Sequence, residues 1–226
     1  MPVNNTEPLS VYRAGPGYAP CLAEMILLAT RAQHKRGILD FLLGLPEPVI
    51  LRVMARLAMH PAQAWGRIDN TFVALVDGVC SGTATARPAD PFGDFPYTPE
   101  PFREVAAELH IEPELVEAAL ERQKRLLYWL SPGDEPEPEG MWLLEYLAVR
   151  RPFRAGGVAR GLMERVMQEV RAAGGSGLEL YCEIGNVQAE RLYATLGFSV
   201  LREYIYDEAA VGFHGVGVRQ LRIMFA

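Results

Sequence analysis

The feature that most constrains the fold is the segment 141–173, in which a long apolar run, a glycine-containing turn and an amphipathic stretch follow one another. The run MWLLEYLAV at 141–149 is almost continuously apolar, as expected for a strand buried on both faces of a sheet. Residues 157–173 then place apolar side chains on one face of a helix, namely Val158, Leu162, Val166 and Val170. A buried strand followed by an amphipathic helix predicts an α/β fold.

Further strands and helices are expected on both sides of this segment. Strands are expected at 9–13, 71–77, 79–86, 178–184, 199–206 and 218–225, and helices at 18–35, 47–60 and 186–196. Asp77-Gly78 lies between two of these strands and predicts a tight hairpin, because both residues tolerate positive φ. We expect a single domain over residues 1–226 that contains an insertion at about 87–140.

The insertion combines expected helix with a polar linker and is strongly acidic. Residues 102–130 are expected to be helical with a break near Pro113, and SPGDEPEPEG at 131–140 is expected to be an extended linker. The insertion carries 13 acidic and 5 basic side chains, more than enough to account for the chain's net charge of -6. It can be interpreted as an acidic wall that attracts a cationic amine. The simpler interpretation, a solvated helical face with a charged linker, is favoured.

Charge and cysteine usage exclude several classes of protein. The net charge of -6 argues against a general nucleic-acid binder, because neutralising phosphates requires a basic surface. No run reaches the roughly 18–20 apolar residues of a membrane span, and no signal pattern opens the chain, so a cytoplasmic protein is expected. Cys21, Cys80 and Cys182 are widely spaced and form no CxxC or Cys/His cluster. Neither a disulfide framework nor a metal site is therefore expected.

The turn that precedes the helix at 157–173 is a candidate anion-binding site. It reads Arg154-Ala155-Gly156-Gly157-Val158-Ala159, and the first N–H groups of a helix have no partner within the helix. Together with the helix dipole they suit a diphosphate, and glycine allows a ligand to approach closely. An ordinary strand–helix turn, with glycines for tightness, fits the same residues. The GxxxxGK[ST] and GxGxxG patterns are absent, which argues against a P-loop or dinucleotide-binding protein.

Two blocks of this sequence together resemble a known family. The first is Leu147-Ala148-Val149 followed by Arg-x-x-Gly-x-Ala at 154–159. The second is Asn186-x-x-Ala-x-x-x-Tyr193-x-x-x-Gly-Phe, which ends at Phe198. In this order they are similar to the GNAT N-acetyltransferases over roughly 141–206. The resemblance implies a mixed, largely antiparallel sheet of about six to seven strands with a splayed central pair, flanking helices, and a helical insertion between strands three and four.

The resemblance also implies how acetyl-CoA is held. The backbone of Leu147 and Val149 would pair with the pantetheine arm in the gap of the splayed strands. The N–H groups of 154–159 would hold the diphosphate, with Arg160 as an added contact, and Asn186 would touch the pantetheine or only cap its helix. The implied cofactor-binding residues are Leu147, Val149, Arg154, Ala155, Gly156, Gly157, Val158, Ala159, Arg160 and Asn186.

Two side chains are candidates for the chemistry. Tyr193 follows Asn186 by two helical turns and shares its face, and the family's tyrosine at this position donates a proton to the CoA thiolate. The alternative is a core tyrosine. Glu145 lies within an apolar strand, where a carboxylate is costly unless it is partnered or solvated. Some family members use a glutamate there as general base, whereas the alternative is a solvent-facing or structural glutamate.

Other reactive residue types are interpreted as structural. Cys182 is expected to be a buried, inert thiol, and Glu183 to be a charge at the strand edge rather than a second base. The four histidines, including His34, are scattered without metal-ligand spacing and are interpreted as surface or core residues.

The sequence therefore predicts an acetyl-CoA-dependent N-acetyltransferase. The acetyl group would move to a primary amine of an unidentified small molecule or peptide by direct attack in a ternary complex, with the N–H of Val149 steadying the oxyanion. No metal, nucleic acid or membrane partner is expected, and the resemblance allows a homodimer. A non-catalytic acyl-CoA-binding sensor and a transferase of longer acyl chains are the alternatives.

Overall fold

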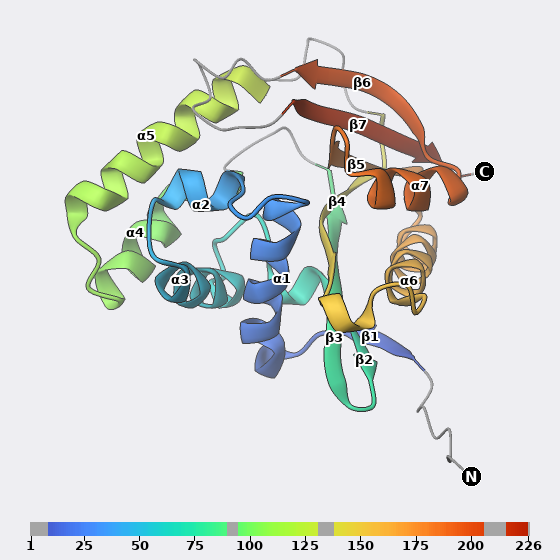
Figure 1. Ribbon diagram of the computed structural model, residues 1–226, viewed down its shortest axis with the longest axis horizontal. Coiled ribbons are helices and arrows are strands. Elements are labelled where there is room, and N and C mark those ends of the chain that lie inside the picture. The colour runs from blue at the N-terminus through green and yellow to red at the C-terminus, as the bar shows by residue number, and fades with distance from the viewer. Residues whose placement is uncertain (1–8, 90–94, 131–137, 206–215, 226) are drawn as a thin grey trace.

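A seven-stranded sheet forms the centre of the computed structural model, which describes residues 9–89, 95–130, 138–205 and 216–225. The strand order is β1-β2-β3-β4-β5-β7-β6 (Figure 1). The strands are β1 (Ser10–Arg13), β2 (Thr71–Val76), β3 (Val79–Pro88), β4 (Met141–Val149), β5 (Gly177–Glu183), β6 (Ser199–Ile205) and β7 (Gly217–Met224). Only β4 and β5 pair in parallel, and the other neighbours are antiparallel. The predicted mixed, largely antiparallel sheet is confirmed.

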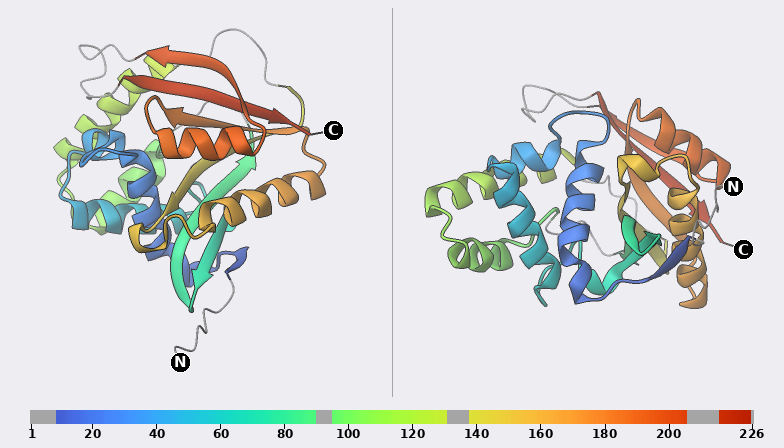
Figure 2. Two further views of the ribbon diagram at one scale, coloured as in Figure 1. Left: turned by 45° about the vertical axis from the view of Figure 1, so that its right-hand side comes forward. Right: turned by 60° about the horizontal axis from the view of Figure 1, so that its bottom comes forward.

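Helices cover both faces of this sheet. They are α1 (Ala19–Arg31), α2 (Ile38–Leu43), α3 (Glu47–Met59), α4 (Pro99–Glu108), α5 (Pro113–Leu130), α6 (Val158–Ala172) and α7 (Val187–Thr195). The two views of Figure 2 show α6 and α7 on one side of the sheet, whereas α1 to α5 form a thicker layer on the other. The sequence predicted these helices except α2, whose six residues are too few for a clear period.

The apolar run of β4 is buried on both faces, as predicted. Leu143 and Tyr146 belong to the core beneath α1 to α5, and Leu144 and Val149 belong to the core beneath α6. The buried side chains of α6 include all four apolar residues predicted from its period. The β4–turn–α6 unit is thus held from both sides of the sheet by apolar burial, the main stabilising term in folding.

The central strands β4 and β5 separate along their length. They pair from Met141 opposite Gly177 only as far as Leu144 opposite Leu180. Beyond that point β4 continues beside β3 up to Val149, and β5 continues beside β7. The predicted splayed pair is confirmed, and it leaves a gap between residues 145–149 and 181–183.

The helical insertion lies between β3 and β4, as predicted, and its helices pack on α2 and α3. It consists of α4 and α5, with the break just before Pro113. Several of its acidic side chains form surface ion pairs, such as Glu117 with Arg103 and Glu121 with Lys124. Residues 131–137 of the predicted linker lie outside the described residues.

The expectation that the cysteines stay unpaired is wrong. Cys21 on α1 and Cys80 on β3 form a disulfide that closes 59 residues of chain. The two residues are close in space because α1 packs on β3 and β4. Their spacing along the sequence does not indicate that contact. Cys182 is free and buried, as predicted.

We expect this disulfide to be detectable by thiol titration. Unreduced protein should show one reactive thiol in denaturant, from Cys182, and three after reduction. On the loop-entropy argument, reduction should lower the free energy of unfolding by about 4 kcal/mol. The double variant Cys21→Ser/Cys80→Ser is the control, because reduction should leave its stability unchanged. Three reactive thiols in the unreduced, denatured protein would show that the pair does not form.

Candidate functional site

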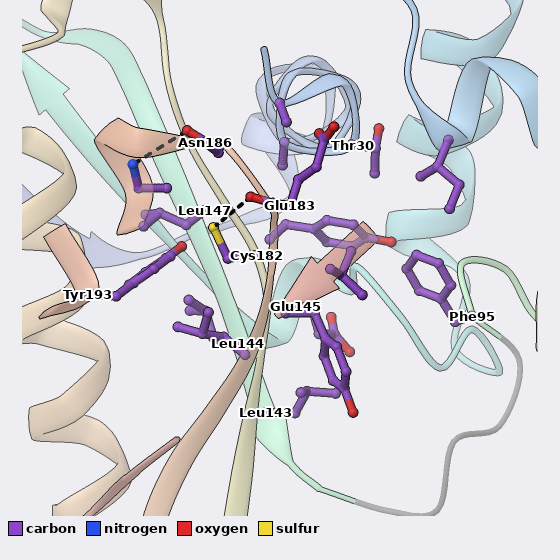
Figure 3. Close-up of a pocket in the computed structure, with 18 of the residues that line it drawn as sticks. Thr30, Phe95, Leu143, Leu144, Glu145, Leu147, Cys182, Glu183, Asn186 and Tyr193 are labelled. Carbon is purple, nitrogen blue, oxygen red and sulfur yellow. Dashed lines mark hydrogen bonds between the residues drawn. The ribbon is translucent and has the colours of Figure 1, made fainter. Parts of the chain in front are cut away.

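A cavity of roughly 180 Å³ opens where β4 and β5 separate. Its lining comes from α1 and the residue after it, α2, β4, β5, α7, β7 and the loops before β2 and α4. Four residues predicted from the sequence meet there, namely Glu145, Leu147, Asn186 and Tyr193 (Figure 3). The residues of the candidate anion-binding turn, 154–159, are not part of this lining, and residues 154–157 are exposed beyond the end of β4.

The backbone of β4 directs hydrogen-bond donors into the gap. The N–H of Arg150 donates to the carbonyl of Ser81 on β3 at 2.8 Å. Because successive N–H groups along a strand point to opposite sides, those of Val149 and Leu147 point away from β3, towards β5. With β5 displaced at this level, both groups face the space in which the resemblance places the pantetheine arm.

The turn before α6 presents a row of backbone donors. Ala155 and Gly157 adopt positive φ of 65° and 80°, and Gly157 is the N-cap of α6. The first N–H bonded within this helix is that of Gly161, which donates to the carbonyl of Gly157 at 2.9 Å. Among the described residues, the N–H groups of 155–160 have no acceptor. Residues 154–157 are exposed, so this helix terminus is accessible to an anion.

The arginines near this turn are held by the protein itself. Arg154 donates through Nε to the carbonyl of Val149 at 3.1 Å and so fixes the turn to the end of β4. Arg160 donates to Thr195 Oγ1 on α7 at 2.8 Å, and its guanidinium also lies 3.7 Å from Glu164. The Arg160 side chain therefore joins α6 to α7 and is not directed at the turn, which leaves backbone N–H groups as the principal donors there.

Tyr193 is a buried phenol at the edge of the cavity. Its exposed fraction is 6%, and burial raises the pKa of its hydroxyl well above the ordinary value. The hydroxyl points towards the space between Leu147 and Cys182 (Figure 3). It forms no hydrogen bond with any described residue. Tyr193 is therefore protonated in neutral solution, and its hydroxyl faces the gap.

Asn186 begins α7, as predicted. Its side-chain oxygen accepts from the N–H of Ala189 at 3.4 Å, and the residue also lines the cavity. The cap uses the amide oxygen alone. The side-chain NH₂ group can therefore serve a ligand without loss of the cap.

Glu145 is fully buried and ion-paired. Its side chain has an exposed fraction of 0%, and Oε1 accepts from Arg87 Nε at 2.6 Å. Its other oxygen accepts from the N–H of Gly66 at 2.7 Å. These contacts favour the structural alternative for Glu145, because a neighbouring guanidinium stabilises the charged carboxylate and makes it a weaker base.

A second carboxylate in the cavity was interpreted from the sequence as an edge charge. Glu183 lies at the end of β5, and its Oε1 is hydrogen-bonded to Nε2 of His34 from the segment after α1. The pKa of Glu183 is raised, chiefly by burial, although His34 acts in the opposite direction. Beside it, burial raises the pKa of the Cys182 thiol to about 12, in keeping with an inert cysteine.

An aromatic wall, which we define as Trp65, Phe95, Tyr146 and Tyr181, lines the cavity and was not predicted from the sequence. The rings of Trp65 and Phe95 meet edge to face, with centroids 4.7 Å apart. These residues come from the loop before β2, the insertion, β4 and β5. No local pattern therefore links them. Phe95 is the only described insertion residue in the lining, so the described part of the insertion does not place an acidic wall there.

Among the described residues, no three His, Cys, Asp or Glu side chains are grouped so that they could hold a metal ion. None of the described helices has both the length and the apolarity needed to cross a membrane.

Comparisons with known proteins agree with this fold. The family model for the acetyltransferase (GNAT) family matches residues 52–198. No curated protein matches the sequence significantly. Among solved structures, an N-acetyltransferase from Staphylococcus aureus Mu50 is 16% identical, with a TM-score of 0.58, over 95% of this chain and 100% of that one. An acetyltransferase from Salmonella typhimurium solved with acetyl-CoA, yncA, is 15% identical over 97% and 95% of the two chains, with a TM-score of 0.54.

An agmatine N-acetyltransferase variant in its apo form is also similar, at 17% identity and a TM-score of 0.55, over 96% of this chain and 99% of that one. At such identities these structures establish the fold alone. The family model spans more than half of the chain, and the protein therefore belongs to the GNAT family of acetyl-CoA-dependent N-acetyltransferases.

Proposed function

We propose that the protein moves the acetyl group of acetyl-CoA to a primary amine of a small molecule or peptide, by direct attack while both substrates are bound. The observation that carries this proposal is the gap between β4 and β5, with backbone donors on one side and the Tyr193 hydroxyl at its edge. We also propose that residues 1–226 act as one acetyltransferase domain, because α4 and α5 share an apolar core with α1 and α3.

Acetyl-CoA would lie along the open part of β4. The N–H groups of 155–160 would bind the diphosphate, with Gly157 allowing its close approach. Leu147 would pair with the pantetheine arm, the Asn186 amide would donate to one of its carbonyl groups, and Val149 would meet the thioester. The open turn, the separated strands and the uncommitted N–H groups all suit a long, anionic thioester of this kind.

Groups of the protein itself would then catalyse the acetyl transfer. The N–H of Val149 would hold the thioester carbonyl and stabilise the oxyanion formed by amine attack. Tyr193 would donate its phenolic proton to the departing thiolate. Such general acid catalysis contributes typically about 10²–10⁴-fold to the rate.

For Glu145 the contacts support a positioning role rather than the predicted role of general base. Its carboxylate joins Arg87 on β3 to the N–H of Gly66 and so holds the loop that carries Trp65 against the cavity. The indole ring of Trp65 also lies 5.2 Å from the Arg87 guanidinium carbon. A group other than Glu145 would then accept the proton from the amine.

A paired substitution tests this role. Glu145→Gln alone should cost about 3–5 kcal/mol of stability, because it leaves a buried guanidinium without its counter-charge. The double variant Arg87→Gln/Glu145→Gln should recover much of that loss and keep kcat within about tenfold of the wild type. If Glu145 were the general base, both variants would instead lose about 10²–10⁴-fold in kcat. Denaturant unfolding and steady-state kinetics measure the two effects.

The proposed function is tested directly with purified protein, acetyl-CoA and a panel of amines. Release of free CoA should depend on the amine, and mass spectrometry should find the acetylated product. Calorimetry should show acetyl-CoA binding in the absence of an amine. Binding without transfer to any amine would support the non-catalytic sensor instead.

A further inference from the structure

The two ends of the cavity differ in chemistry. Asn186, Leu147 and Tyr193 lie on one side, the side assigned to acetyl-CoA under the proposed function (Figure 3). Phe95 lies on the opposite side, with Glu145 and Glu183 between the two. The part of the cavity opposite the acetyl-CoA side is therefore mainly apolar and also carries carboxylates.

The two carboxylates are not equally available to a ligand. Both oxygens of Glu145 are engaged, one by Arg87 and one by Gly66. Glu183 is hydrogen-bonded to His34 through Oε1, whereas its Oε2 accepts from no described residue. The Glu183 side chain is 11% exposed, so this oxygen lies in a partly desolvated position. A carboxylate there can hold His34 and a cationic ligand at the same time.

The surroundings of Glu183 suit an apolar group. Besides the aromatic wall, the described lining of the cavity includes Ile38, Leu143 and Val218, and its only charged side chains are the two glutamates. Among the described lining residues, a second positive charge on a ligand would face aromatic and aliphatic surface with no uncommitted counter-ion, and burying it there is costly. An apolar substituent there gains from leaving water.

On this basis we propose that the acceptor is a monoamine with an aromatic or alkyl body, which lies against the aromatic wall while its ammonium group binds Glu183. This proposal rests on the proposed acetyltransferase function and specifies its substrate class. It also assigns to Glu183 the proton-accepting role that Glu145, held by Arg87, is poorly placed to fill.

The protons can be followed through the transfer. The bound ammonium gives one proton to Glu183, and the neutral amine attacks the thioester carbon. As the carbon–nitrogen bond forms and the carbon–sulfur bond breaks, Tyr193 protonates the thiolate. The second proton lost from nitrogen returns the Tyr193 phenolate to its neutral form. The proton on Glu183 leaves to solvent, so that the products are an amide, CoA and one released proton.

A matched pair of amines tests the substrate class. n-Pentylamine and 1,4-diaminobutane have chains of equal length and differ in whether the far end is methyl or ammonium. With the full-length protein and acetyl-CoA, kcat/KM should be roughly 10- to 100-fold higher for pentylamine. 2-Phenylethylamine should be at least as good as pentylamine, whereas spermidine should be a poor substrate.

Two variants test the residues. Phe95→Ala should lower kcat/KM for 2-phenylethylamine by about tenfold and leave that for ethylamine nearly unchanged. Glu183→Gln should lower kcat/KM for all the amines by about 10²-fold or more, and leave acetyl-CoA affinity unchanged. Glu203→Gln on β6 is the control, because that carboxylate pairs with Arg219 and does not line the cavity. It should retain wild-type kinetics.

The failure of this proposal can be told apart from failure of the proposed function. Transfer that favours the diamine, or that is unaffected by Glu183→Gln, would overturn the acceptor assignment and leave the acetyltransferase intact. Acetyl-CoA binding without transfer to any of these amines would also overturn the acceptor assignment. Absence of acetyl-CoA binding would overturn the proposed function itself.

Discussion

Replacing Gly157 with glutamate is expected to weaken acetyl-CoA binding by at least about 100-fold, or about 2.7 kcal/mol. A Cβ at Gly157 would have no heavy atom within 4 Å, so the new side chain would project into open space at the terminus of α6. The proposed site for the diphosphate is there. The carboxylate would repel the diphosphate, compete for the N–H groups of 155–160 and offset the favourable helix dipole.

Gly174 offers a matched control at the other end of the same helix. It has φ of 77°, against 80° for Gly157, and a Cβ there also has no neighbour within 4 Å. Gly174→Glu therefore imposes a similar backbone cost, of about 1–2 kcal/mol, and the same change in net charge. Calorimetry with CoA should show wild-type affinity for the Gly174 variant and no measurable binding for the Gly157 variant. Equal affinities would refute the assignment of the turn.

Much of the β4–turn–α6 unit can be predicted from the sequence because its signals are local. The apolar run of β4 and the helical period of α6 each fall within a single window of sequence. The Asn186–Tyr193 spacing likewise places both residues on one helix face, and in the structure both line the cavity. These parts of the site follow from the order of the residues along one strand, one turn and two helices.

The rest of the site depends on contacts between distant segments, which no local pattern records. Arg87 and Glu145 pair across 58 residues, and His34 and Glu183 across 149. The apolar setting of Glu145 did indicate that this carboxylate needs a partner, but its identity depends on the pairing of β3 with β4. Likewise, nothing local distinguishes Glu183 from an edge charge, because its burial arises from the segment after α1 that covers the end of β5.

Replacing Tyr193 with phenylalanine is expected to lower kcat by roughly 10²-fold and to leave acetyl-CoA affinity nearly unchanged. The substitution removes only the hydroxyl, and that hydroxyl forms no hydrogen bond with the described residues. Little stability should therefore be lost. The ring contact with Phe198, at a centroid distance of 5.7 Å, is retained. The decrease in kcat should arise in the step that breaks the carbon–sulfur bond.

Tyr97→Phe controls for the removal of a buried phenolic hydroxyl. Tyr97 is also buried with a raised pKa, but it lies in the helical layer, donates to the carbonyl of Ala119 and does not line the cavity. Loss of the Tyr97 hydroxyl should lower the free energy of unfolding by about 1 kcal/mol, for one hydrogen bond, and leave kcat unchanged. A Tyr193→Phe protein with wild-type kcat would exclude Tyr193 as the acid. The thiolate would then leave unprotonated or take its proton from water, and the burial that keeps the Tyr193 phenol protonated would have only a structural role.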